Sequence, residues 1–134
     1  MIEYRLGNNL PLDEVIDCYV SSTLGERRPV EDREKMAAML AHANLVVTAW
    51  EGDLLVGIAR SLTDFAYVAY VSDLAVRASH QRQGIGRELL RRTKAACGKD
   101  AYLTLLSAPK AVEYYPHIGF EAHPSAWIWR SGEI

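Results

Sequence analysis

Several classes of protein are excluded by what this sequence lacks. It contains only two cysteines, Cys18 and Cys97, without a Cys-x-x-Cys spacing, so we expect two reduced, mostly buried thiols and no disulfide. No apolar run approaches the roughly 18 residues that cross a membrane. The N-terminus reads Met-Ile-Glu, with an acid where a secretion signal would be basic. We therefore expect a cytoplasmic protein without a membrane partner.

The sequence also lacks an excess of basic charge. Lysine and arginine together number 15 against 17 aspartates and glutamates, which gives a formal net charge of −2. Because proteins that bind nucleic acids usually carry a clear basic excess, we expect no nucleic-acid partner. The four histidines show no spacing typical of a metal site, such as His-Glu-x-x-His, so we also predict no metal.

What the sequence does contain is enough apolar material for one folded domain. The chain has 134 residues, of which 49% are hydrophobic and 24% charged, as is typical of globular proteins. A chain of this length buries roughly two-thirds of its extended surface. We therefore predict a single domain over residues 1–134, without linkers or repeats.

Hydrophobic periodicity divides the chain into strands and helices. Leu12, Ile16 and Tyr19 recur at helical spacing after Pro11, a residue that the first turn of a helix tolerates. The expected strands are residues 1–6, 44–50, 54–62, 65–76 and 101–106. One expected helix starts at Pro11, and three more cover residues 32–43, 86–99 and 109–117. A last hairpin is expected from Phe120 onward, with its return strand at 126–130.

This order predicts an α/β fold in which helices cover both faces of a mixed sheet. Apolar residues occupy both faces of the strand at 65–76, so we expect it to be central and covered on both sides. A helix and the strand at 101–106 follow it, and such a unit makes the two strands parallel. Trp127 and Trp129 share one face of the last strand, where we expect them to belong to the core.

The most informative segment opens the helix after the strand at 65–76. Residues 81–87 read Gln-Arg-Gln-Gly-Ile-Gly-Arg. The first turn of a helix presents free N–H groups to an anion, and Gly84 and Gly86 remove side chains that would block a phosphate. A P-loop would need Lys and Ser or Thr after the glycines. A dinucleotide site would need a third glycine or alanine where Leu89 stands.

Two segments together resemble a known family. Residues 71–76 read Val-Ser-Asp-Leu-Ala-Val before the glycine loop, and residues 111–120 read Ala-Val-Glu-Tyr-Tyr-Pro-His-Ile-Gly-Phe. With one helix and one strand between them, these motifs are similar to those of the GCN5-related N-acetyltransferase family, called GNAT. The resemblance covers nearly the whole chain. Two positions depart from the family pattern: Ala108 replaces a frequent asparagine, and Pro116 replaces a frequent charged residue.

The resemblance implies a GNAT-like fold with acetyl-CoA as the cosubstrate, bound in a cleft between two parallel strands that splay apart. The pantetheine arm pairs with the edge of the first strand, and the pyrophosphate lies on backbone N–H groups of the glycine loop. The 3′-phosphate lies near Arg82, Arg87 or Arg91. The residues implied in cosubstrate binding are Leu74, Ala75, Val76, Arg82, Gln83, Gly84, Ile85, Gly86 and Arg87.

The resemblance also implies an N-acetyltransferase that moves the acetyl group directly to a primary amine of a small molecule or a peptide. Tyr115 matches the family's general-acid tyrosine, which protonates the CoA thiolate. A backbone N–H of residues 73–76 donates to the oxyanion. Because an alkylamine is almost wholly protonated near pH 7, a base is needed, and Asp73 is the first candidate, ahead of His80 and His117.

Other interpretations stay open from the sequence. A CoA-binding sensor or interaction domain would keep the cosubstrate site without turnover, and another acyl donor or an O-acceptor would fit the same scaffold. Tyr115 as a packing residue and Asp73 as an acceptor of backbone hydrogen bonds are the alternatives for the two catalytic candidates. Arg27 and Arg28 would suit an acidic substrate, but a solvated loop pair is the favoured interpretation. We also expect a homodimer, with the tryptophans of the last hairpin at the contact.

Overall fold

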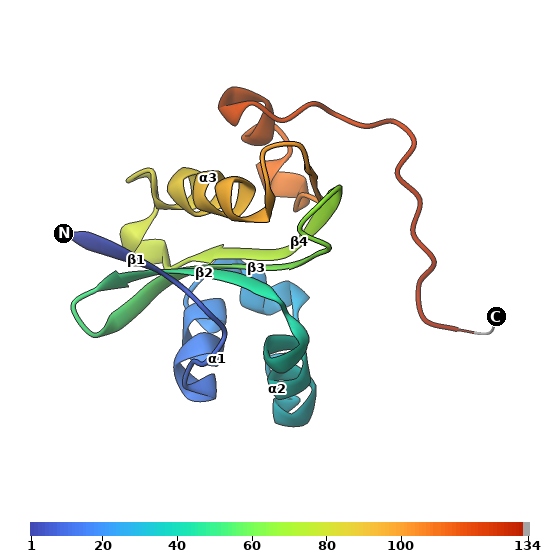
Figure 1. The fold of residues 1–134 in the computed structure, drawn as a ribbon. Helices are drawn as coiled ribbons and strands as arrows, with labels where there is room; N and C mark the ends of the chain where they lie inside the picture. The colour runs from blue at the N-terminus through green and yellow to red at the C-terminus, as the bar shows by residue number, and fades with distance from the viewer. Residues whose placement is uncertain (133–134) are drawn as a thin grey trace.

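A five-stranded sheet forms the centre of the fold, with helices on both of its faces (Figure 1). The computed structural model describes residues 1–132. The strands are β1 (Ile2–Leu6), β2 (Leu45–Glu51), β3 (Leu54–Thr63), β4 (Val68–Val76) and β5 (Tyr102–Leu105), the α-helices are α1 (Leu12–Val20), α2 (Arg33–His42) and α3 (Ile85–Cys97), and the 3₁₀ helices are η1 (Thr23–Arg27), η2 (Ala78–His80), η3 (Pro109–Ala111) and η4 (Tyr115–Ile118). Neighbours in the order β1-β2-β3-β4-β5 are antiparallel, except that β4 and β5 are parallel. The predicted mixed sheet and its parallel pair are confirmed.

The helix ends follow from residues that the sequence supplies. α1 begins directly after Pro11, because a proline N–H is not needed there. The Asp32 carboxylate caps α2 by accepting a hydrogen bond from the Lys35 amide at 3.1 Å. α3 ends at Gly98, whose φ of 106° is unfavourable for residues with side chains. None of the helices in residues 1–132 is long and apolar enough to cross a membrane.

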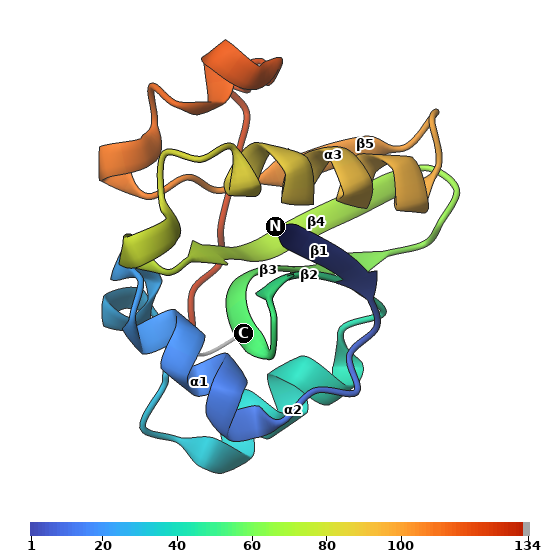
Figure 2. The same cartoon turned by 90° about the vertical axis from the view of Figure 1, so that its left-hand side faces the viewer.

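Two layers of apolar side chains attach the helices to the sheet. Tyr19 of α1 and Met36 of α2 are buried on one face, together with Ile58 of β3. Ile85 and Leu89 of α3 are buried on the opposite face. Figure 2 shows α3 and the pair of α1 and α2 on opposite sides of the strands.

The centre of the sheet consists of β2 and β3, whose residues are buried on both faces. The prediction that the strand at 65–76 is central is therefore wrong, and its double covering holds only for the end of β4 that carries Leu74, Ala75 and Val76. α3 packs on Leu74 and Val76 near one end of β4, and Val68 and Tyr70 at the other end stay exposed.

This strand also begins later than predicted, at Val68. The Asp64 carboxylate accepts hydrogen bonds from the amides of Ala66, Tyr67 and Val68 at 2.9, 2.8 and 3.1 Å. Such a turn competes with strand pairing, and it places Phe65 at a φ of 58°. The apolar composition of residues 65–67 therefore does not make them part of the strand.

The two cysteines lie in the apolar layers as free, buried thiols, as predicted. Burial raises the pKa of the Cys18 thiol to about 11. Because the thiolate is the reactive form, Cys18 is unsuited to act as a nucleophile.

The C-terminal segment differs most from its prediction. The helix predicted over 109–117 is replaced by η3 and η4, and none of residues 120–132 lies in a strand. Figure 1 shows this segment running away from the sheet, so the predicted hairpin is wrong. Trp127 and Trp129 are 93% and 72% exposed, and their assignment to the core is wrong too. Residues that favour strands form one only beside a hydrogen-bonded neighbour.

Candidate active site

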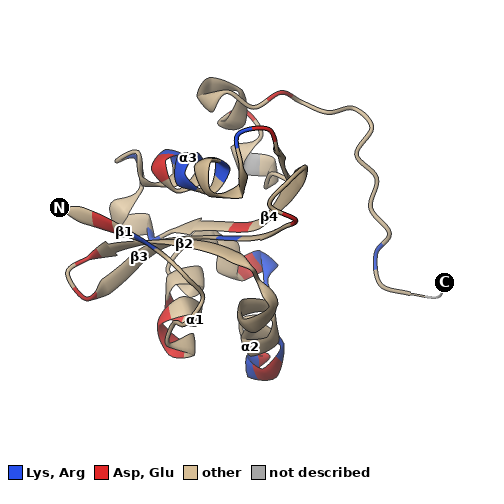
Figure 3. Ribbon diagram, viewed as in Figure 1, with Lys and Arg blue, Asp and Glu red and all other residues tan. Residues whose placement is uncertain are grey.

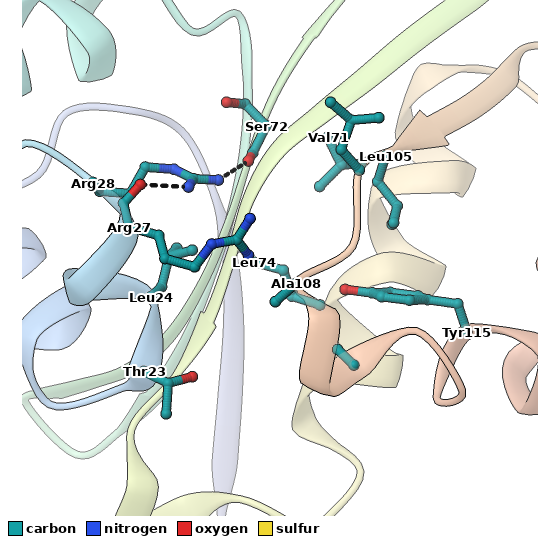
Figure 4. Close-up of a pocket in the computed structure, with 12 residues that line it drawn as sticks. Thr23, Leu24, Arg27, Arg28, Val71, Ser72, Leu74, Leu105, Ala108 and Tyr115 are labelled. Carbon is teal, nitrogen blue, oxygen red and sulfur yellow. Dashed lines mark hydrogen bonds between the residues drawn. The ribbon is translucent and has the colours of Figure 1, made fainter. Parts of the chain in front are cut away.

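A cavity of about 120 Å³ opens where β4 and β5 separate (Figure 4). The pairing of the two parallel strands ends at Val71 and Leu105, although β4 continues to Val76. η1 lies on one side of this gap, and the segment of η3 and η4 lies on the other. The polar residues of the lining are Thr23, Arg27, Arg28, Ser72 and Tyr115, and the other lining residues are aliphatic.

The edge of β4 that faces the gap carries main-chain groups without a partner strand in the described chain. The Arg77 amide donates to a β3 carbonyl at 2.9 Å, whereas the Val76 carbonyl accepts from the Gln81 side chain at 2.9 Å. Successive strand residues direct their main-chain groups to alternate sides. The main-chain groups of Leu74 and Val76 therefore face the open edge, and those of Ala75 face β3.

The loop after β4 leads into the first turn of α3. Arg82 and Gly84 adopt left-handed φ values of 64° and 81°. The Glu88 amide donates to the Gly84 carbonyl at 3.0 Å, and the amides before Glu88 have no intrahelical partner. A Cβ on Gly86 would lie in ordinary contact, 3.5 Å from the Tyr114 hydroxyl. Packing therefore does not demand glycine at position 86, whereas close approach of a phosphate would.

Arginines surround this turn, and they differ in their partners. Arg91 and Arg92 both donate to the Glu88 carboxylate, with distances between 2.6 and 2.8 Å. These hydrogen bonds lower the pKa of Glu88 to about 2. Within residues 1–132, Arg82 and Arg87 have no such side-chain partner. They are the arginines of this turn that remain available to an anion.

Tyr115 reaches the cavity from η4. Its ring packs edge-on against Tyr114 and Phe120, with centroids 5.3 and 5.5 Å away. Its hydroxyl points into the cavity (Figure 4). Burial, and secondarily the neighbouring Tyr114, raises the pKa of Tyr115. The phenol therefore keeps its proton at neutral pH and is a hydrogen-bond donor to the cavity.

Asp73 lies beside the cavity but is sealed from it, with 1% of the residue exposed. Its carboxylate accepts hydrogen bonds from the Tyr19 hydroxyl at 2.6 Å, from Arg60 Nε at 2.5 Å and from Arg28 Nε at 2.6 Å. Burial alone would raise the pKa of Asp73, but the hydrogen bonds from Arg60, Tyr19 and Arg28 lower it. A general base needs a suitable pKa and access to the amine, and this environment provides neither.

Comparison with known proteins agrees with this geometry. Residues 23–130 match the acetyltransferase (GNAT) domain family. The chain belongs to the GNAT acetyltransferase family. The recognition from two sequence motifs and the predicted GNAT fold are thereby confirmed.

Among curated GNAT relatives, the chain is similar to histone acetyltransferase TAP1 of Glycine max, with 31% identity over 111 residues. The match covers 73% of this chain and 47% of the soybean protein. It is also similar to a probable acetyltransferase, TAP2, of the same plant, with 31% identity and 44% of that protein covered. The chain thus spans about half the length of these relatives.

Solved structures share the GNAT fold along nearly the whole chain. A GNAT family acetyltransferase of Streptococcus pneumoniae TIGR4 superposes with a TM-score of 0.77 at 28% identity, covering 98% of this chain and 100% of the other. An aminoglycoside N-acetyltransferase in complex with CoA has a TM-score of 0.71 at 15% identity, covering 98% of this chain and 95% of the other. The second likeness is one of fold alone.

Within this GNAT fold, the residues implied in cosubstrate binding divide by accessibility. Gln83, Gly84 and Arg87 lie at the exposed loop and first turn. The Ile85 side chain is buried between α3 and the sheet, so only its main chain is available to a ligand. Tyr115 lines the cavity, whereas His80 and His117 do not belong to its lining. In the part of the chain described, no group of three or more His, Cys, Asp or Glu residues is arranged to bind a metal ion.

Sequence reasoning missed part of the surroundings of the GNAT cavity. Arg28 donates to Asp73 and to the carbonyls of Ser72 and Arg27 at 2.7 and 2.8 Å, so the prediction of a solvated Arg27–Arg28 loop pair is wrong for Arg28. Arg60 of β3 donates to the same Asp73 carboxylate, and this contact was not predicted. A buried arginine in a strand of aliphatic residues was the one available signal, because an interior cation requires a counter-charge.

Proposed function

We propose that this chain transfers the acetyl group of acetyl-CoA to a primary amine of a small molecule or a peptide. The observation that carries this proposal is the cavity between the separated ends of β4 and β5. It joins the open edge of β4 to Tyr115 on one side and to η1 on the other. An acyl donor along β4 and an acceptor beside η1 would meet in this gap.

The residues present fit acetyl-CoA as the donor. The main-chain groups of Leu74 and Val76 on the open edge would pair with amides of the pantetheine arm. The first turn of α3, bare at Gly86 and flanked by Arg82 and Arg87, would hold the pyrophosphate through main-chain N–H groups.

The reaction forms a bond from the amine nitrogen to the acetyl carbon and breaks the carbon–sulfur bond of the thioester. The amine loses a proton and the departing CoA sulfur carries a negative charge that must be stabilised. Tyr115 would donate its hydroxyl proton in a hydrogen bond to that sulfur and act as its general acid. A main-chain N–H on the open edge, such as that of Leu74, would stabilise the oxyanion.

Asp73 is better suited to positioning than to proton transfer. Its hydrogen bonds to Arg28 and Arg60 tie η1 to β3 and β4 beside the acceptor side of the cavity. The amine proton would then pass to water, since the described lining contains neither a carboxylate nor an imidazole. The same observation favours the alternative function, a CoA-binding sensor domain with little turnover.

The first experiment measures thermal stability with acetyl-CoA, with NAD and ATP as controls, and then release of the CoA thiol in the presence of a panel of amines. A ligand at 100 times its Kd adds about 2.7 kcal/mol, or roughly 5–15 °C for a domain of this size. Stabilisation by acetyl-CoA with thiol release supports the transferase. Stabilisation without release from any amine supports the sensor, and no stabilisation would contradict both.

We further propose a homodimer in which exposed apolar side chains of the C-terminal segment form the contact. Trp127, Ile128 and Trp129 are all exposed, and large exposed apolar groups favour association. Light scattering after size exclusion tests this proposal. A monomeric mass at micromolar concentration, unchanged in a Trp127→Ser/Trp129→Ser variant, would contradict it.

A further inference from the structure

The described residues that line the acceptor side of the cavity include positive charge and no negative charge, and the exposed Glu26 of η1 lies outside this lining. We propose that the acceptor is a small amine that bears an anionic group, a carboxylate in the first instance, and that Arg27 binds this group. The inference rests on the proposed acetyl transfer and names the chemical class of the acceptor. It also assigns Arg27 as a residue that determines specificity.

The lining of the cavity contains two charged residues among those described, Arg27 and Arg28, and both are cationic. Two carboxylates are adjacent in sequence to lining residues. The Asp73 side chain has 0% exposure and lies under Arg28 and Arg60, and the exposed Glu26 is not part of the described lining. A second positive charge on an acceptor would find no counter-charge there. Polyamines and lysine-rich peptides are therefore poor candidates.

The charge of this region is positive although the whole chain is not. Two guanidinium groups, Arg28 and Arg60, share the single carboxylate of Asp73, which leaves one positive charge uncompensated. Burial raises the pKa of Tyr19, so this partner of Asp73 contributes no charge. Arg27 adds a further positive charge, in a chain whose formal net charge is −2. Figure 3 shows basic positions on the segment between α1 and α2 that carries both arginines.

Arg27 and Arg28 differ in how many of their donors are free. Arg28 donates from Nε to the Asp73 carboxylate, and its two terminal nitrogens donate to the main-chain carbonyls of Ser72 and Arg27. The Arg27 side chain has no hydrogen-bond or ion-pair partner among the residues whose side chains the structure describes. Figure 4 shows it extending across the cavity towards the side from which the Tyr115 hydroxyl enters. Its planar donors are thus free to bind a carboxylate through two parallel hydrogen bonds.

The size and remaining lining of the cavity limit the acceptor further. The volume of about 120 Å³ suits a small molecule, and the non-polar lining is aliphatic. Arg27 is exposed, so a carboxylate would replace its water partners with a charge-assisted pair, whereas a neutral acceptor would form no such pair. A compact amine with an adjacent carboxylate and an aliphatic side chain meets these conditions.

Positive charge beside the acceptor also favours its neutral amine, which the reaction needs because the described lining contains no general base. A cation near an ammonium group disfavours the charged form and lowers its pKa, so a larger fraction of bound acceptor has a nucleophilic nitrogen. The ionisable groups that face this position are Arg27 of η1, Arg28 directly after it and Tyr115 of η4. Asp73, Arg60 and Tyr19 are sealed behind Arg28, and the exposed Glu26 of η1 lies outside the described lining. None of the three facing groups is a neutral base at pH 7.

The test compares matched acceptors at saturating acetyl-CoA. Leucine, leucinamide and isoamylamine differ in the carboxylate and also in the pKa of the amine, so kcat/KM is expressed per neutral amine. Spermidine and a lysine-rich peptide represent cationic acceptors. We expect kcat/KM for leucine to exceed that for leucinamide by about tenfold or more, as one charge-assisted bidentate pair allows. Equal or better turnover of leucinamide, spermidine or the peptide would overturn the proposal. O-phosphoethanolamine against ethanolamine shows whether a phosphate replaces the carboxylate.

Variants identify the residue that is responsible. Arg27→Gln should abolish the preference by raising KM for leucine, with little change for leucinamide, and Arg27→Lys should restore part of it. In Arg27→Gln the acidic limb of the pH profile of kcat, which reports groups in the bound complex, should move to higher pH, and a merely structural role would not cause this shift. Arg33→Gln, on the surface pair with Asp13, is the matched control and should keep the preference. A preference that survives Arg27→Gln would refute the assignment.

Failure of the proposed function is distinguishable from failure of this inference. If acetyl-CoA stabilises the chain but no amine is acetylated, titration calorimetry in the presence of CoA compares N-acetylleucine with N-acetylleucinamide. At least about tenfold tighter binding of the acid, lost in Arg27→Gln, supports the anion site without turnover. Equal affinity for the acid and the amide rejects it.

Discussion

At the scale of single residues, Asp73 illustrates how one buried carboxylate organises its neighbours. Asp73→Asn should lower the free energy of unfolding at pH 7 by about 3–5 kcal/mol, because it leaves the buried Arg60 and the half-buried Arg28 without their counter-charge. Urea unfolding followed by circular dichroism measures this loss. Asp13→Asn, which removes the carboxylate of an exposed ion pair with Arg33, serves as the control and should change stability little.

The contribution of Asp73 should also depend on pH with a defined sign. Its pKa is lowered in the folded state, so its stabilisation is complete above the unfolded value of about 3.9. The stabilisation is lost as the pH falls from there through the lower folded value. The difference in unfolding free energy between wild type and Asp73→Asn should therefore be constant from pH 5 to 8 and shrink below about pH 4. A difference that grows on acidification would contradict this account.

Tyr115 gives the second prediction at this scale. Tyr115→Phe keeps the ring contacts with Tyr114 and Phe120 but removes the hydroxyl that points into the cavity. We expect kcat to fall by about 100-fold or more, with little change in the melting temperature or the KM for acetyl-CoA. Because its pKa is raised, activity should not decline through loss of the Tyr115 proton at neutral or mildly alkaline pH.

Tyr114→Phe is the matched control for this substitution. Tyr114 is a neighbour in sequence and in space, but it does not belong to the cavity lining. If both variants lose activity to the same extent, the effect is not specific to the hydroxyl that enters the cavity, and the role of Tyr115 as an acid is refuted.

At the scale of elements, the first turn of α3 separates a structural glycine from a functional one. Gly86→Ala introduces a Cβ that meets only ordinary contacts, and alanine favours a helix over glycine by about 1 kcal/mol. We expect a melting temperature that is unchanged or higher, together with at least about tenfold weaker acetyl-CoA binding by calorimetry, because the methyl group covers the bare turn. Stability and affinity should thus move in opposite directions.

Gly52→Ala provides the comparison for this prediction. Gly52 lies in the β2–β3 turn with a φ of 58° and open space around it, so alanine there strains the backbone without touching the loop. This variant should lose stability and keep its affinity for acetyl-CoA. If Gly86→Ala binds acetyl-CoA as tightly as wild type, the turn is not the phosphate site.

Helix ends that are set by a nearby capping residue or glycine could be predicted from the sequence. The start of β4 and the structure of the C-terminal segment could not. α2 is fixed by its cap at Asp32 and α3 by Gly98 at its end. The start of β4 was missed because the Asp64 turn competes with the apolar pattern of the residues that follow it. The C-terminal hairpin was predicted from β-forming composition, which does not specify a partner strand.

The candidate site shows the same division. The glycine loop and Tyr115 were found because each belongs to a contiguous motif. The Asp73 network joins Tyr19, Arg28 and Arg60 across 54, 45 and 13 positions of sequence, and only the folded sheet brings them together. Long-range ion pairs of this kind leave no periodic signal in a single sequence.

At the scale of the whole molecule, the cavity depends on the sheet and on η1, η3 and η4, and none of its described lining residues follows Tyr115. The described residues after Phe120 are all exposed. The sheet, its two helix layers and the cavity are therefore complete without the C-terminal segment. This separation makes the segment's contribution to stability and to association measurable on one variant.

A chain that ends after Phe120 should keep its unfolding free energy at low protein concentration to within about 1 kcal/mol, because no described residue beyond Phe120 is buried. It should also keep acetyl-CoA binding and lose association, since Trp127 and Trp129 are removed. Denaturant unfolding, calorimetry and light scattering measure the three properties. Deletion of residues 1–7, which removes β1 from its pairing with β2, should by contrast destabilise the fold. A loss of about 2 kcal/mol or more in the C-terminal truncation would mean that this segment packs against the body of the protein and covers apolar surface there.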